Sequence, residues 1–397
     1  MRKKLSFLIA LAICLSTTTT SFAAAESTTG NSDSSIVQVD NSRLNLTMYD
    51  ATSGIEKNNT EIKLMKDKVD SLYKQYDLDH EIGIALDTSS SGVDKIQAKT
   101  QQLITPLKDQ QNIKNQQFAL DVRLNNLKFD MERQYLNILT SNDQIDNINK
   151  TLTNIDEQIN KLQQQINLGL ATNDSLNSLN VQKSQLMNQI DSINADIDSS
   201  MLTIKQYLNV DLNRNLNLAD AKKEFAIFDD TNVSSKIDEA VAKDYGVIEA
   251  QNSLDIAKKQ QEIYKQYDND ISGGLTGAES DLLKAQNDLV AAKANAKTNI
   301  WNKYYTLKSD ENAVETQALN LKSAQSDYDK AKSNYDNGMT DKLALDTAAL
   351  ALDKQKNMSQ RSKNEYMIIQ EQFKYMLDGH ASAQLSTKAI GTSGIDY

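Results

Sequence analysis

The sequence has few of the residues that interrupt helices or build a thick globular core. Among 397 residues there is one proline, Pro106, and there are 13 glycines; aromatic residues make up 6% and the mean hydropathy is -0.56. The single cysteine, Cys14, lies near the N-terminus, in a segment expected to be removed. The mature chain would then have neither a disulfide nor a thiolate metal site. This composition favours long two-stranded helical packing over a thick globular core.

Acidic residues outnumber basic ones, 54 to 43. The formal net charge is -11 and the pI is about 4.9. Because binding to nucleic acid phosphates needs clustered lysine and arginine, we expect no nucleic acid partner. The acidic balance otherwise indicates only a well-solvated surface.

The N-terminus has the three parts of a secretory signal peptide. Arg2 to Lys4 is basic, Leu5 to Leu15 is apolar, and Ser21 to Ala25 supplies small residues for cleavage. Acylation at Cys14 is the alternative, but Ile13 fits poorly where a lipoprotein has a small residue. We predict a signal peptide over residues 1–25, a flexible leader over 26–43, and an exported protein of the cell envelope or the extracellular space.

The segment from Ile145 to Leu208 has the pattern of a helical hairpin. Apolar residues recur every three or four positions on both sides of Gly169, as expected for two helices packed in antiparallel fashion. Gly169 can adopt the left-handed conformation that ends a helix, and Thr172, Asn173 or Asp174 can cap the next one. The ascending stripe contains Ile145, Ile148, Leu152, Ile155, Ile159, Leu162 and Ile166.

The same layout occurs a second time. A shift of 169 residues places Tyr135 on Tyr304, and Gly169 on Gly338, without a gap. This indicates two copies of one all-α unit, each a long antiparallel coiled-coil hairpin. The predicted boundaries are 44–210 for the first repeat, 211–234 for an irregular or extended link, 235–379 for the second repeat and 380–397 for a flexible tail.

No catalytic constellation, nucleophile motif or phosphate-binding loop is recognisable, so the sequence predicts neither an enzyme nor a cofactor. The two histidines, His80 and His380, fall in a predicted loop (80–92) and in the predicted tail, where solvated side chains are expected rather than metal ligands. Carboxylates at helical spacing beside basic residues are typical of a solvated helix face. These carboxylates include Asp327, Asp329, Glu365 and Glu371.

Several short motifs resemble the TolC family of outer-membrane efflux proteins, over most of the mature chain. The first is at Leu46-Thr47 with Ala51 and Asn58 to Ile62; the others are Gly169 to Thr172 with Leu176, and Tyr335 to Met339 with Leu345. The resemblance implies a homotrimer whose helical hairpins form a tunnel. It also implies docking of the hairpin tips onto a periplasmic adaptor protein and a membrane pump.

The sequence departs from that family where membrane strands are expected. A tilted strand needs about 9 to 11 residues of alternating pattern, and neither Ile82 to Leu86 nor the segment between Asp268 and Glu279 provides a pair of them. We therefore expect a TolC-like helical barrel domain without a convincing transmembrane β-barrel. Outer-membrane insertion is accordingly in doubt.

The hairpin tips are the candidate site for docking a partner. Glycine allows close backbone approach, and the apolar residues could fill grooves between a partner's helices. The alternative is that each glycine merely ends a helix and the apolar residue completes the local cap. The tip residues are Gly169, Leu170, Thr172, Gly338 and Met339.

Three functional hypotheses follow. The favoured one is a conduit or docking component of an efflux or secretion assembly. The second is an exported coiled-coil structural or adhesive protein that has lost the channel role. The third, an extracytoplasmic enzyme or binding receptor, has no polar constellation in its favour.

Overall fold

The computed structural model describes residues 43–385 apart from 87–90, 171 and 268–272. The predicted signal peptide, all of the predicted leader but Arg43, and residues 386–397 of the predicted tail lie outside the described residues. The described chain is built almost wholly from α-helices. They are α1 (Met48–Asn58), α2 (Thr60–Ala85), α3 (Val93–Leu103), α4 (Thr105–Asn167), α5 (Asn173–Tyr207), α6 (Val233–Lys243), α7 (Tyr245–Tyr267), α8 (Gly274–Asp336) and α9 (Lys342–Tyr375), with a π-helical turn η1 (Met376–His380) after α9.

The two longest helices, α4 and α8, have the same length of 63 residues, and both of their boundaries differ by 169 residues. The predicted helix with the stripe from Ile145 to Ile166 is therefore confirmed, and it begins at Thr105, well before that stripe. It begins there because Pro106 stands in the first turn, where its missing N–H is not needed. The predicted loop over residues 80–92 is wrong at its start, since α2 continues to Ala85.

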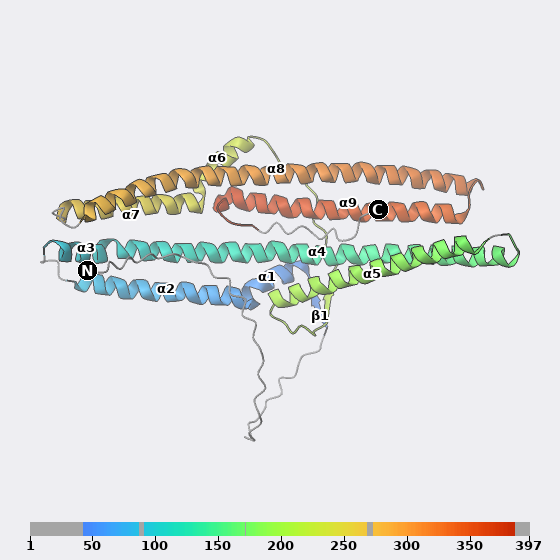
Figure 1. Cartoon of the computed structure of the whole chain (residues 1–397), viewed down its shortest axis with the longest axis horizontal. Helices are drawn as coiled ribbons and strands as arrows, with labels where there is room; N and C mark the ends of the chain where they lie inside the picture. Colours follow the sequence, from blue (N-terminus) through green and yellow to red (C-terminus); the bar gives the residue numbers. More distant parts are fainter. Residues whose placement is uncertain (1–42, 87–90, 171, 268–272, 386–397) are drawn as a thin grey trace, which may run out of the picture. The chain divides into compact units, whose positions relative to one another are not determined.

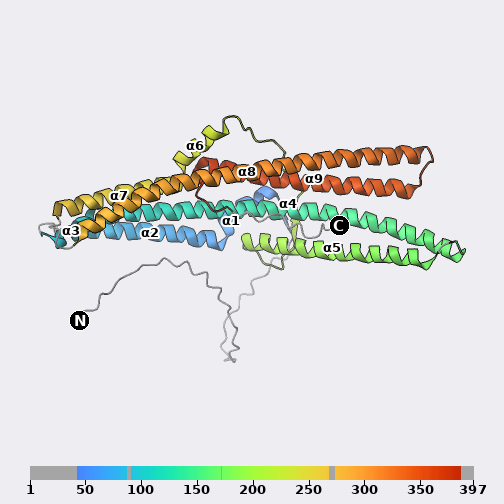
Figure 2. The ribbon, with the colours of Figure 1, turned by 45° about the horizontal axis from the view of Figure 1, so that its top comes forward.

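Helix α4 lies in the middle of the packing, as Figures 1 and 2 both show. It contacts α1, α2 and α5 on one side and α7 and α9 on the other. Helix α8, in contrast, packs against α6, α7 and α9. The fold is thus two long antiparallel hairpins, α4 with α5 and α8 with α9, that meet along α4 and α9.

Each hairpin has its own apolar core. In the first half, Leu127, Met131 and Tyr135 of α4 are buried against α1 and α5. In the second half, Ile300 and Leu307 of α8 are buried with residues of α6 and α9. Side chains at three- and four-residue spacing fall on one helix face, which explains why the periodic stripes become these cores.

The link between the halves contains a short strand. Strand β2 (Leu216–Leu218) pairs in parallel with β1 (Leu44–Leu46) at the start of the first repeat. After β2 the link follows α9: Gln370 Nε2 donates to the carbonyl oxygen of Ala226 at 2.8 Å, and the Phe228 N–H donates to the Tyr366 hydroxyl at 2.8 Å.

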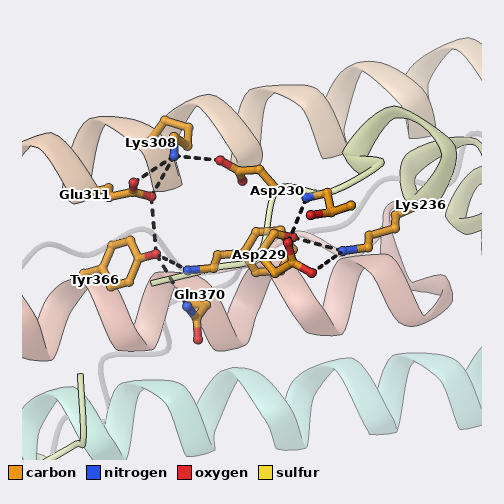
Figure 3. A network of polar contacts seen from close by, with 9 residues as sticks. Asp229, Asp230, Lys236, Lys308, Glu311, Tyr366 and Gln370 are labelled. Carbon is orange, nitrogen blue, oxygen red and sulfur yellow. Dashed lines mark hydrogen bonds and ion pairs between the residues drawn. The ribbon is translucent and has the colours of Figure 1, made fainter. Parts of the chain in front are cut away.

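A polar network fixes the far end of the link to α8 and α9 (Figure 3). Lys308 on α8 bonds Asp230 of the link at 2.8 Å and Glu311 on its own helix at 2.8 Å. Lys236 of α6 donates to the backbone oxygen of Asp229 at 2.9 Å. The irregular segment between the repeats is therefore held by side chains where regular structure is absent.

The first residues of the predicted flexible tail differ from expectation. Ala381 is fully buried, and the Ser382 N–H donates to Asp244 Oδ2 at 2.8 Å. The His380 ring stacks on Tyr375 with centroids 3.9 Å apart, and its Nε2 lies 3.1 Å from Asp121 Oδ2. The expectation of a solvated His380 is wrong, because neighbours from α4 and α9 enclose the ring.

The expectation that membrane strands are missing concerned two segments that the structure describes only in part. Residues 87–90 and 268–272 lie outside the described residues, whereas Ile82 to Ala85 and Gly274 to Glu279 belong to α2 and α8. Among the helices that the structure describes, none carries an apolar stretch long enough to cross a membrane.

Candidate functional site: the hairpin tips

The first tip is a tight helix end built around Gly169. This residue adopts a φ of 72°, in the left-handed region that favours glycine. The Gly169 N–H donates to the Ile166 oxygen at 2.9 Å and the Leu170 N–H to the Gln165 oxygen at 2.8 Å. These two bonds form a Schellman motif, which satisfies the last carbonyl groups of α4.

The second tip repeats this geometry. Gly338 has a φ of 67°, its N–H donates to the Tyr335 oxygen at 2.9 Å, and the Met339 N–H donates to the Asn334 oxygen at 2.8 Å. A Cβ added to Gly169 or to Gly338 would meet no atom within 4 Å. Glycine is therefore required at both tips by its backbone conformation and not by crowding.

The apolar residue after each glycine is exposed. Leu170 is 75% exposed and Met339 is 69% exposed. In a Schellman motif this residue commonly packs on the one five positions earlier, but here those residues are Gln165 and Asn334. The local cap contact therefore does not explain the apolar side chains, and this favours the docking interpretation.

The two tips differ where the next helix begins. Asp341 caps α9 by accepting from the Ala344 N–H at 3.0 Å, whereas Thr172, at the corresponding position before α5, makes no side-chain cap bond. Thr172 is exposed. Asp341 thus has a capping role at the second tip that Thr172 does not share at the first.

The long helices bring both tips to the same end of the packing. Bonds between α4 and α9 follow an antiparallel register: Arg133 with Glu365, Thr140 with Asn357 and Lys150 with Asp353. Continued toward the C-terminus of α4, this register leads to the start of α9. The ends of α4 and α8 therefore point the same way, as Figure 1 shows.

A cluster of buried charged residues between the hairpins was missed at the sequence level. Arg133 of α4, 2% exposed, forms a two-pronged bond to Glu365 of α9 at 3.0 and 3.2 Å. Lys303 of α8 donates to Gln372 of α9. Burial, with the charge of Arg133, lowers the pKa of Lys303 to about 8. Burial and the charge of Glu365 raise the pKa of Asp310 to about 6.

A second set of charges joins the link to both hairpins. Lys223 of the link lies 2.6 Å from Glu132 of α4 and 2.6 Å from Glu371 of α9. The prediction of a solvated face is therefore wrong for Glu365, whereas Glu371 is partly exposed although it pairs with Lys223. The prediction holds for Asp327, which forms an exposed pair with Lys330 at 3.5 Å.

These features define a class: a protein of two long helical hairpins with exposed turns at one end. Within the described ranges, no group of three or more histidine, cysteine, aspartate or glutamate side chains is placed to hold a metal ion. No family model matches the chain. No curated protein matches it either.

Several solved structures do match. The Campylobacter jejuni CmeC outer membrane channel aligns with a TM-score of 0.63 and 11% identity, over 84% of this chain and 85% of that one. The open state of the Neisseria gonorrhoeae MtrE outer membrane channel aligns with a TM-score of 0.61 and 9% identity, over 86% of this chain and 91% of that one. The outer membrane protein VceC from Vibrio cholerae aligns with a TM-score of 0.59 and 9% identity, over 84% of this chain and 96% of that one. The chain has a TolC-like fold, as the sequence motifs predicted.

Proposed function

We propose that this protein is a conduit component of an efflux or secretion assembly in the cell envelope. It acts as a homotrimer, and its hairpin tips dock onto an adaptor protein that connects it to a membrane pump. The observation that carries the proposal is the pair of matching tips at one end of a TolC-like fold, each with an exposed apolar residue after the glycine. Brought together at one end of the assembly, these apolar residues would form a contact patch for a partner.

The free flank of α8 supports assembly into a ring. Its exposed apolar residues fall on one face of a 3.6-residue helix, away from the seam that contains Ile300 and Leu307. Trp301 lies on the same face, stacked with Tyr305 at 5.7 Å. The exposed residues of this α8 face are Leu283, Val290, Tyr305 and Leu319.

The opposite flank of the chain is formed by α2 and α5. Leu64, Leu78 and Ile82 of α2 are exposed and also fall on one helix face. Because the α8 face and the α2 face are different surfaces, a contact between them joins copies head to tail. Such a contact closes into a ring when the rotation between copies is right.

Light scattering on the exported chain tests the assembly. The proposal predicts the mass of three chains, and particle images of the same peak should show a hollow axis. Val290→Glu with Leu319→Glu would place charges on the α8 face and should yield single chains of unchanged helicity. The matched control is Lys293→Glu with Lys322→Glu on the same helix, which should remain trimeric. A single chain from the wild-type protein would contradict the conduit and favour a structural or adhesive role.

The tips need a separate test, because they are not part of the ring contact. A photoreactive residue at Thr172, placed in the protein in its own cell, should crosslink to a second envelope protein. Adding Leu170→Asp and Met339→Asp should abolish that product and leave the trimer intact. Crosslinking that survives both changes would exclude the tips as the docking surface.

A further inference from the structure

The link between the repeats is held at one point by a lysine that two carboxylates share. Lys223 Nζ lies 2.6 Å from Glu132 Oε2 on α4 and 2.6 Å from Glu371 Oε1 on α9. The Lys223 side chain is 7% exposed, that of Glu132 is 18% exposed and that of Glu371 is 37% exposed. One cation therefore faces two anions from two different helices, and water reaches Lys223 and Glu132 poorly.

The charge of this group does not balance when both carboxylates are ionised. Two carboxylates and one ammonium leave a surplus negative charge, and a buried surplus charge is costly. If Glu132 takes up a proton, Lys223 and Glu371 become a neutral pair. The protonated carboxyl can then donate a hydrogen bond instead of repelling Glu371.

We propose that Glu132, Lys223 and Glu371 form a pH-sensitive clasp, which holds the link against both repeats and loosens as the pH rises. The clasp is a property of one chain and does not depend on the conduit or on the trimer. Here one side chain of the segment joining the repeats contacts both α4 of the first repeat and α9 of the second. Loosening the clasp would release this part of the link from α4 and α9.

The direction follows from the environment of Glu132. Burial raises its pKa from 4.5 to about 7; the charge of Lys223 opposes this and that of Glu371 adds to it. In the folded chain the group therefore keeps its proton over a range where the unfolded chain has lost it. The clasp's contribution to stability is thus largest at low pH and falls as the pH rises through about 7.

The chain contains a similar group that serves as a control. Lys308 also binds two carboxylates, those of Asp230 and Glu311, each at 2.8 Å (Figure 3). Its side chain is 31% exposed, compared with 7% for Lys223. Water therefore reaches the Lys308 group, and we expect it not to loosen over the same pH range.

A spin label on the link tests the clasp in the full chain. Cys14→Ser removes the only cysteine, and Glu224→Cys places the label at an exposed position beside Lys223. From about pH 5 to about pH 9, the ratio of mobile to immobile label should rise by up to about tenfold per pH unit in the transition. Glu132→Gln should keep the label immobile throughout, and Glu311→Gln should leave the wild-type profile unchanged.

Two outcomes would overturn the clasp. One is a Glu132→Gln profile that equals the wild-type profile, and the other is a wild-type label whose mobility does not change with pH. Glu371→Gln provides a second test, because it also leaves one carboxylate for one lysine and should keep the label immobile. Far-UV circular dichroism at each pH checks that every variant remains folded.

Discussion

Helices α4 and α8 are the same element used twice, yet they have different surroundings. Both span 63 residues and both end in the same glycine-centred turn. Helix α4 has neighbours on two sides, whereas one face of α8 bears exposed Val290 and Leu319. Helical period and termination therefore follow from local sequence, whereas burial follows from the place of each copy in the packing.

The difference is clearest at positions that the 169-residue shift makes equivalent. Tyr135 is fully buried and reaches the link, whereas Tyr304 is partly buried. Arg133 is buried in an ion pair, whereas its counterpart Asn302 is exposed. The buried Arg133–Glu365 pair thus lies where the two copies meet.

Among these substitutions, the largest loss of stability is expected at Arg133. Arg133→Ala would leave the carboxylate of Glu365 without its partner in a poorly hydrated place, and we expect a loss of about 3 kcal/mol in the free energy of unfolding. The equivalent change Asn302→Ala should alter it by less than about 0.5 kcal/mol. Urea denaturation measures both. Equal losses would mean that the two copies do not differ at this level.

The next largest loss of stability is expected at the two tip glycines, and it should be the same in both copies. Gly169→Val and Gly338→Val each force a β-branched residue into the left-handed region, at a cost of about 2 kcal/mol. Because both turns have the same bonds and open surroundings, the two losses should agree within about 0.5 kcal/mol. Denaturation midpoints measure the losses, and far-UV circular dichroism should show nearly unchanged helicity. A loss at one tip alone would show that the turns are not equivalent.

These cases also show what could be predicted from the sequence. The long helices, the glycine at each turn and the 169-residue offset follow from local spacing, and the structure contains all three. The α2 helix was predicted too short because its polar end resembles a loop, although its contacts with α3 and α4 keep it helical.

The buried charges could not be predicted, since the two partners are far apart in sequence. Arg133 and Glu365 are separated by 232 positions, and only the packing of α4 on α9 brings them together. On a single helix each residue looks like a solvated charge. For the same reason, exposure of the tip side chains became known only with the structure.

A smaller effect is expected at Tyr135. Its hydroxyl lies 2.6 Å from the Ala219 oxygen and 2.8 Å from the Leu46 oxygen, and it can donate its proton to one of them at a time. Tyr135→Phe removes this bond from a buried to partly buried place, at a cost of about 1 kcal/mol. Tyr304→Phe should cost less than half of that, because Tyr304 is less buried. Thermal unfolding of the two variants at one pH measures both losses. A larger loss of stability for Tyr304→Phe than for Tyr135→Phe would contradict this prediction.

The smallest effect separates the two tips themselves. Asp341 accepts a bond from the Ala344 N–H at 3.0 Å, whereas Thr172 makes no side-chain cap bond. Asp341→Ala should therefore cost about 0.5 kcal/mol, the low end for an exposed N-cap, and Thr172→Ala should cost nothing measurable. Urea denaturation with replicate midpoints resolves such a difference. If Thr172→Ala left stability unchanged, the Thr172 hydroxyl would have no capping role in solution. If it destabilised the chain as much as Asp341→Ala, Thr172 would be a helix cap in solution.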